Sequence, residues 1–173
     1  MALTWHRSRQ TPQGLDEIFM VNYLAKFILA NRLLRAGIIP NNTFAGNGKA
    51  KGELPRMLYI SSDSHQSASP IDWEEFGTYF EYGVRKAINN YSYYKLVMNT
   101  FATELSRRLM REDGPDVLVN VMCPGPVNSN IARDAPPFLK AFLKTLFRIF
   151  FRSPEKAALP VTYICSSPDF EGV

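Results

Sequence analysis

The sequence contains few cysteines and has no long uninterrupted apolar run. Only two of its 173 residues are cysteines, Cys123 and Cys165. Both lie among apolar residues without metal-site spacing, which argues against a disulfide framework and favours a reducing compartment. No uncharged apolar stretch reaches the roughly 18 residues that a membrane-spanning helix needs. The first 13 residues carry no apolar core of a signal peptide. We therefore expect a protein that is not secreted, either cytoplasmic or peripheral on an intracellular membrane.

The overall composition is that of a globular chain. Hydrophobic residues make up 46% of the sequence and charged residues 21%, which excludes disorder, collagen and a coiled coil. A length of 173 residues favours a single domain. The net charge of +4 is too small to indicate nucleic-acid binding, and no cluster of residues indicates a metal site.

Hydrophobic periodicity predicts an α/β protein. Apolar residues recur at helical spacing in two long segments, and a short valine-rich run is typical of a strand buried on both faces. Strands that alternate with long helices indicate a parallel sheet, although only two strands are predicted. The predicted elements are helices over 15–36, 91–111, 138–152 and 154–165, strands over 56–60 and 117–123, a flexible loop over 38–55, and a loop with short helical turns over 63–90.

A tyrosine and a lysine four residues apart form a candidate acid–base pair. Tyr91 and Lys95 lie on one face of the predicted helix. A nearby ammonium lowers a phenol pKa, so this pair could move a proton to or from an alcohol oxygen. Ser62 follows a predicted strand and could hydrogen-bond the same oxygen. The spacing is weak evidence by itself, because Tyr82 and Lys86 show it too. The long amphipathic helix that continues after Lys95 favours the first pair.

Four blocks of sequence resemble the short-chain dehydrogenase/reductase family, most closely its retinol-dehydrogenase-like branch. Their order and approximate spacing also match, so the joint signal is stronger than any single block. The blocks are LDEIFMVNYLAKFILANRLL at 15–34, RMLYISS at 56–62, YSYYKLVMNTFATELSRRL at 91–109 and VNVMCPGPVNS at 119–129.

The resemblance implies four catalytic residues. Ser62 would orient the substrate carbonyl, and Tyr91 would give or take the proton. Lys95 would lower the pKa of Tyr91 and hydrogen-bond the nicotinamide ribose. Asn22 would hold a water in the proton relay, unless it is an ordinary polar residue on a buried helix face.

The resemblance also implies a binding site for NADP or NAD. Pro124 and Gly125 match the turn that lies against the nicotinamide. Val127 and Ser129 match positions that contact the carboxamide, although Ser129 replaces the usual threonine. Tyr91 and Lys95 would complete this site.

One motif of the family is absent. The glycine-rich turn G-x-x-x-G-x-G, which holds the dinucleotide pyrophosphate, occurs nowhere in the chain. We therefore expect a partial Rossmann-like, doubly wound parallel sheet that lacks its first strands. Under this hypothesis the chain 1–173 is one partial domain, the catalytic half of an N-terminally truncated relative.

Residues 137–152 form a basic and aromatic amphipathic segment. Four basic residues recur every four positions among phenylalanines and leucines. This pattern is typical of a helix in a membrane interface, and the resemblance places the substrate lid here. Three interpretations remain open: an apolar-substrate lid that also touches a membrane, plain core packing, and a protein–protein surface.

Two functions are consistent with these observations. The first is an NAD(P)-dependent oxidoreductase that interconverts an alcohol and a carbonyl on an apolar, retinoid-, steroid- or lipid-like substrate. The second is a non-catalytic truncated relative that acts by dimerisation or is unstable. Both allow a homodimer through the helices 15–36 and 91–111.

Overall fold

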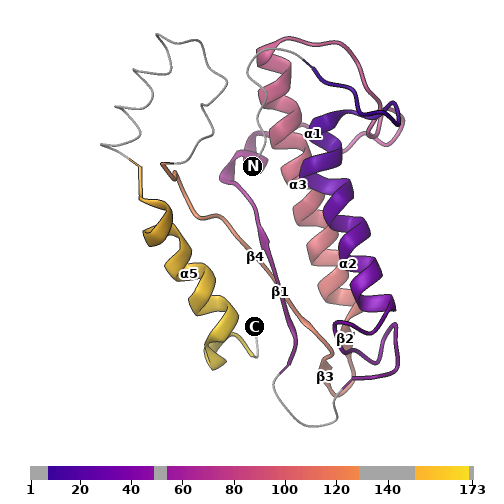
Figure 1. The fold of residues 1–173 in the computed structure, drawn as a ribbon, viewed down its shortest axis with the longest axis vertical. Helices are drawn as coiled ribbons and strands as arrows, with labels where there is room; N and C mark the ends of the chain where they lie inside the picture. The colour runs from indigo at the N-terminus through magenta and orange to yellow at the C-terminus, as the bar shows by residue number, and fades with distance from the viewer. Residues whose placement is uncertain (1–7, 49–53, 129–150, 172–173) are drawn as a thin grey trace.

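The computed structural model describes residues 8–48, 54–128 and 151–171 (Figure 1). Its elements form three layers. A parallel pair of strands, β1 (Arg56–Ile60) and β4 (Leu118–Met122), lies in the middle. The long helices α2 (Ala25–Arg35) and α3 (Val84–Arg108) cover one side, and α5 (Pro154–Ser166) covers the other. The predicted α/β class with a parallel sheet is confirmed.

The two strands of the sheet run in parallel and in register. Arg56 lies opposite Leu118 at one end, and Ile60 lies opposite Met122 at the other. The Ser61 amide extends the ladder by donating to the Met122 carbonyl at 2.7 Å. Both strands therefore end together, and the segments that follow them leave the sheet side by side. The predicted strands 56–60 and 117–123 are confirmed.

The predicted helix 15–36 contains an irregular turn. It consists of α1 (Glu17–Phe19), a π-helical turn (Met20–Leu24) and α2. Asp16 caps its start, where a carboxylate oxygen accepts the Phe19 amide at 3.0 Å. Gly37 ends it with φ of 65°, and a Cβ at this position would collide with the side chain of Asn47.

Helix α3 differs from the prediction at both ends. It begins at Val84, so residues 84–90 are helical. Ala87 in this additional segment is buried in the core. Its packing stabilises the segment, although the neighbouring residues in the sequence are mostly polar. It ends at Arg108, because Met110–Arg111 (β2) pair with Gly114–Pro115 (β3) in a small antiparallel ladder. Residues 63–67 form a short 3-10 helix, η2, as the predicted helical turns allow.

The core lies mainly between α3 and its neighbours. Side chains from α1, α2, β1 and β4 pack along one face of α3 in three adjoining clusters. The most deeply buried large apolar side chains are Ile18, Leu34, Met98, Leu109 and Val117. No helix in the described ranges combines the length and the apolar character that crossing a bilayer requires.

The first part of the predicted flexible loop is firmly held. Asn41 is fully buried, and its side-chain amide donates to the Leu34 and Ile39 carbonyls at 2.9 and 2.8 Å. The carboxylate of Asp116 accepts the amides of Asn42 and Thr43 at 2.6 and 2.7 Å. Residues 38–48 form the predicted loop, and two buried polar side chains hold it in place of secondary structure.

The C-terminal helix is tied to the start of the sheet by one arginine. The Arg56 guanidinium donates to the carbonyls of Ile164 and Ser167 at 2.9 and 2.6 Å and pairs with Glu171 at 2.8 Å. Ser153 caps α5 as its sequence predicts, accepting the Lys156 amide at 3.4 Å. Pro160 lies inside the helix, which still begins at Pro154.

Replacing Asp116 should destabilise the fold. Asp116→Ala removes the acceptor for two backbone amides and for the Thr43 hydroxyl at 2.8 Å. Charge-assisted bonds of this kind are worth about 2–3 kcal/mol, so we expect a loss of that size in urea unfolding followed by circular dichroism. The matched control is Asp113→Ala, whose side chain is 84% exposed and whose loss should cost under about 0.5 kcal/mol. Equal losses in the two variants would contradict the proposed role of Asp116.

Candidate active site

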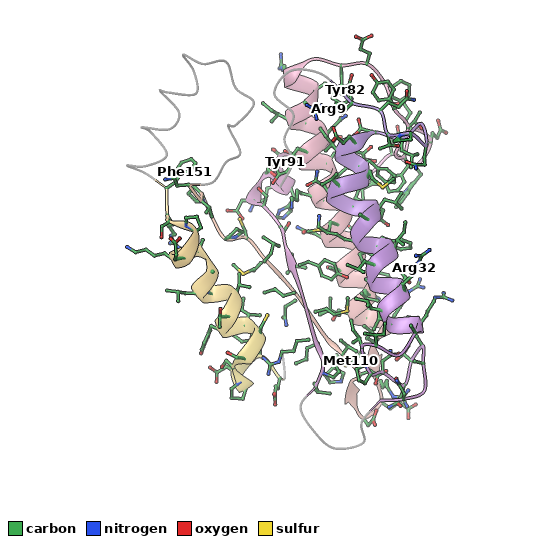
Figure 2. All side chains as sticks on the ribbon, viewed as in Figure 1. Arg9, Arg32, Tyr82, Tyr91, Met110 and Phe151 are labelled. Carbon is green, nitrogen blue, oxygen red and sulfur yellow. The ribbon has the colours of Figure 1, made fainter. Side chains whose placement is uncertain are left out.

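A cavity of about 440 Å³ opens at the carboxyl ends of the two parallel strands. In open α/β sheets, ligands bind at this edge because loops from neighbouring strands diverge there. The walls come from the π turn and α2, the segment after β1, α3, and the segment after β4. The lining residues include Val21, Asn22, Lys26, Ile60, Ser62, Lys95, Cys123, Pro124, Gly125, Val127 and Phe151. In Figure 2, Tyr91 and Phe151 both lie toward this end of the molecule.

The predicted acid–base pair lies beside this cavity. Tyr91 and Lys95 are 6% and 4% exposed, and the Lys95 Nζ lies 5.6 Å from the centre of the Tyr91 ring. Nζ donates to the Ile60 carbonyl at 3.0 Å, which ties α3 to the end of β1. Ser62 caps η2 by accepting the Ser64 amide at 3.3 Å. The three residues, predicted from the two separate blocks 56–62 and 91–109, are thus brought together.

The Tyr91 hydroxyl is the unusual group in this arrangement. It is buried, and it makes no well-formed hydrogen bond with the described residues. Burial raises the pKa of Tyr91 above its ordinary value of 10.0, while the nearby Ser62 side chain acts in the opposite direction. A buried hydroxyl without a partner is costly to a fold. The core residue Tyr59 shares this property, and Tyr91 differs from it in lying near Ser62 and Lys95, which line the cavity.

The pKa of Lys95 lies close to neutral pH. The pKa of Lys95 is lowered from 10.5 to about 8. Burial is the main cause, and the positive charge of Lys26 is the second. Cys123 acts weakly in the opposite direction. A lysine with a pKa of about 8 is mostly protonated at pH 7 and releases its proton more readily than an ordinary lysine.

Asn22 lies in the π turn and is fully buried. Its side-chain amide donates to the Ile18 carbonyl at 3.0 Å, inside its own helix. Its backbone carbonyl accepts the Lys26 Nζ at 3.0 Å. Sequence reasoning missed Lys26, because a lysine on an amphipathic helix ordinarily indicates a solvated face.

The turn after β4 forms an open wall of the cavity. Gly125 has φ of 72°, and a Cβ built on it would meet no heavy atom within 4 Å. Its amide donates to the Cys123 sulfur at 3.4 Å. Val127 forms a parallel bridge with Arg152. Ser129 and residues 137–150 lie outside the described residues, so their predicted roles remain predictions.

The competing pair with the same spacing lines a different cavity, of about 390 Å³, but does not share a helix face. Tyr82 precedes α3, so its spacing to Lys86 is not helical. Its hydroxyl donates to the buried carboxylate of Asp16, and Lys86 is exposed. Tyr82 therefore holds the N-terminal segment to the body of the protein.

Curated relatives cover nearly the whole chain. Retinol dehydrogenase 14 of Homo sapiens is 31% identical over 166 residues, 95% of this chain and 44% of that protein. Polyprenol dehydrogenase of Homo sapiens is 29% identical over 165 residues, 95% of this chain and 46% of that protein. A short-chain dehydrogenase of Arthrobotrys oligospora is 26% identical over 163 residues, 88% of this chain and 46% of that protein.

These relatives confirm the predicted similarity to the retinol-dehydrogenase-like short-chain dehydrogenases. All three are named as dehydrogenases, which supports an oxidoreductase of the short-chain type. The chain spans less than half the length of each of them. No protein-family model matches the chain.

The burial of Lys95 should be visible in the pH dependence of stability. Its pKa is about 8 in the folded chain and near 10.5 when unfolded, so the unfolded state binds more protons between these values. The free energy of unfolding should therefore rise with pH from 8 to 10.5, by up to about 3 kcal/mol. Lys95→Met should lack this rise in urea unfolding measured at each pH. Parallel curves for the two proteins would show that Lys95 has an ordinary pKa.

Proposed function

We propose that this relative of the short-chain dehydrogenases carries the catalytic site of an NAD(P)-dependent oxidoreductase that interconverts an alcohol and a carbonyl. The observation that carries the proposal is the buried Tyr91 hydroxyl, which makes no well-formed hydrogen bond with the described residues and lies near Ser62 and Lys95, two residues that line the cavity. The substrate oxygen would complete the hydrogen bonding of this hydroxyl, which the described protein atoms leave unsatisfied.

The cavity fits the nicotinamide end of a dinucleotide. Its volume of about 440 Å³ suits a ring and a sugar, and no side chain at Gly125 closes the wall after β4. Lys95 lines the cavity and would meet the ribose, while Pro124 and Gly125 would lie against the ring. The bound nicotinamide would supply or accept the hydride. The sequence has no G-x-x-x-G-x-G turn for the pyrophosphate, so the proposal concerns this end of the cofactor alone and does not distinguish NAD from NADP.

The chain's own residues handle the oxygen and its proton. Ser62 is positioned by η2 and would donate a hydrogen bond to the substrate carbonyl oxygen. Tyr91 would give its hydroxyl proton to that oxygen during reduction and accept it back during oxidation. The neighbouring Lys95 ammonium would stabilise the phenolate that forms, because an opposite charge favours the ionised phenol. Asn22 would support this group through the π turn that contains it.

The substrate is proposed to be apolar. Val21, Ile60, Val127 and Phe151 supply apolar walls around the polar groups. Relatives of the chain are named for retinol and polyprenol, both apolar alcohols. The segment 137–152 would add to this surface or touch a membrane.

Self-association is a second part of the proposal. The outer face of α2 leaves Leu29 59% and Ile28 40% exposed. A groove of about 450 Å³ runs between α2 and α3, with Phe27 and Phe101 among its walls. A homodimer through 15–36 and 91–111 would cover these apolar surfaces.

The catalytic proposal is tested by removing one oxygen atom. Tyr91→Phe in the intact natural protein should lower NAD(P)-dependent turnover of a retinoid or polyprenoid carbonyl by roughly 100-fold or more, with little change in fold. Tyr93→Phe is the matched control and should retain turnover, because Tyr93 lies on the same helix outside the cavity lining and its hydroxyl bonds the backbone of Asp72. Full activity of Tyr91→Phe would refute the catalytic role. A protein that self-associates and takes no cofactor would instead favour the non-catalytic alternative.

A further inference from the structure

Lys26 lies in an unusual position for a helical lysine. Its ammonium turns back onto the π turn, where Nζ donates to the Val21 and Asn22 carbonyls, both at 3.0 Å. π-helical turns inside α-helices are rare and occur often at functional sites. These two bonds therefore stabilise the π turn, which contains the cavity-lining residue Asn22.

The same ammonium faces the proposed active site. Lys26 and Lys95 both line the 440 Å³ cavity, one from α2 and the other from α3. An ammonium has three N–H groups, and the described residues provide acceptors for two of those on Lys26. Two positive charges thus share one partly desolvated space, where charge repulsion is stronger than in water.

The other ionisable groups around Lys95 can be named from each packed element. Asp63 follows β1 and also lines the cavity, but it is exposed. Cys123 follows β4, and Tyr91 lies one turn earlier on α3. Lys26 is thus the other ammonium among the described residues of this cavity.

We propose that Lys26 is a positioning residue of the active site. Its ammonium stabilises the π turn and places a second positive charge in the cavity that Lys95 lines. This inference rests on the proposed function. Its effect would be to make the Lys95 ammonium a better acid.

The ionisation of the pair agrees with this arrangement. Burial lowers the pKa of Lys26 below its ordinary value. For Lys95, burial is the main cause of the lowered pKa, and the charge of Lys26 is the second. Removing the charge of Lys26 should therefore raise the pKa of Lys95 part of the way back.

The test is a direct NMR titration of lysine side chains in the full chain, labelled with ¹³C at Cε. In the wild type, Lys95 should titrate near pH 8. Lys26→Met should move its midpoint upward by roughly half a pH unit or more. Lys26→Gln should give the same rise, because an amide can still donate to the two carbonyls but carries no charge. Lys26→Arg should leave the midpoint low, and Lys86→Met, an exposed lysine on α3, should not change it.

The outcomes are separable. An unchanged Lys95 midpoint in both uncharged variants would overturn the proposal, as would an equal rise in Lys26→Arg. If Lys26→Met does not fold, Lys26→Gln still decides between the two results. The titration needs neither cofactor nor turnover, so its failure is distinct from retained activity in Tyr91→Phe, which would refute the proposed function instead.

Discussion

The parallel pairing of β1 with β4 is the constraint on which the rest of the site depends. Because Ile60 lies opposite Met122, both strands end at the same level, and the segments that begin with Ser61 and Cys123 leave the sheet together. Helix α3 is attached at this level by the Lys95 bond to the Ile60 carbonyl and by a 2.6 Å bond between Ser61 and Asn99. A shift of one residue between the strands would separate Ser62 from the turn at Gly125.

The site concentrates groups that a stable fold would avoid. A buried phenol without a partner, a nearly buried lysine and a second lysine beside it each cost stability. These three groups lie near one edge of the sheet. Behind them, the buried Asp16 and Asp116 are hydrogen-bonded, although the buried Tyr59 hydroxyl also lacks a partner among the described residues. Strongly perturbed groups that gather in a cavity are typical of active sites.

The sequence predicted the parts of the fold that follow simple periodicity. The central helix was predicted from apolar residues at helical spacing, whereas the two strands were predicted from short continuous apolar runs and the last helix from its Ser153–Pro154 start. The π turn at Met20–Leu24 was not predicted, because one extra residue per turn leaves the apolar pattern almost unchanged. The held segment 38–48 was missed as well, since its order depends on Asn41 and on Asp116, which lies far away in the sequence.

The candidate site was predicted to a similar degree. Ser62 was proposed from one block, and Tyr91 and Lys95 from another, and the three lie together in the structure. The long helix after Lys95 favoured Tyr91 over Tyr82 in the sequence, and the start of α3 at Val84, which leaves Tyr82 outside the helix, agrees with that choice. Lys26 could not be predicted, because its importance comes from its bonds to a turn that the sequence does not reveal.

The most direct test of the central claim is to map where a nicotinamide cofactor touches the chain. NADH and NADPH can be titrated separately into the ¹⁵N-labelled protein while backbone amide shifts are followed by NMR. The account predicts that either reduced cofactor shifts the amides of Ser62, Lys95 and Gly125, which line one cavity. Shifts confined to the groove between α2 and α3, or no shifts at millimolar cofactor, would contradict it.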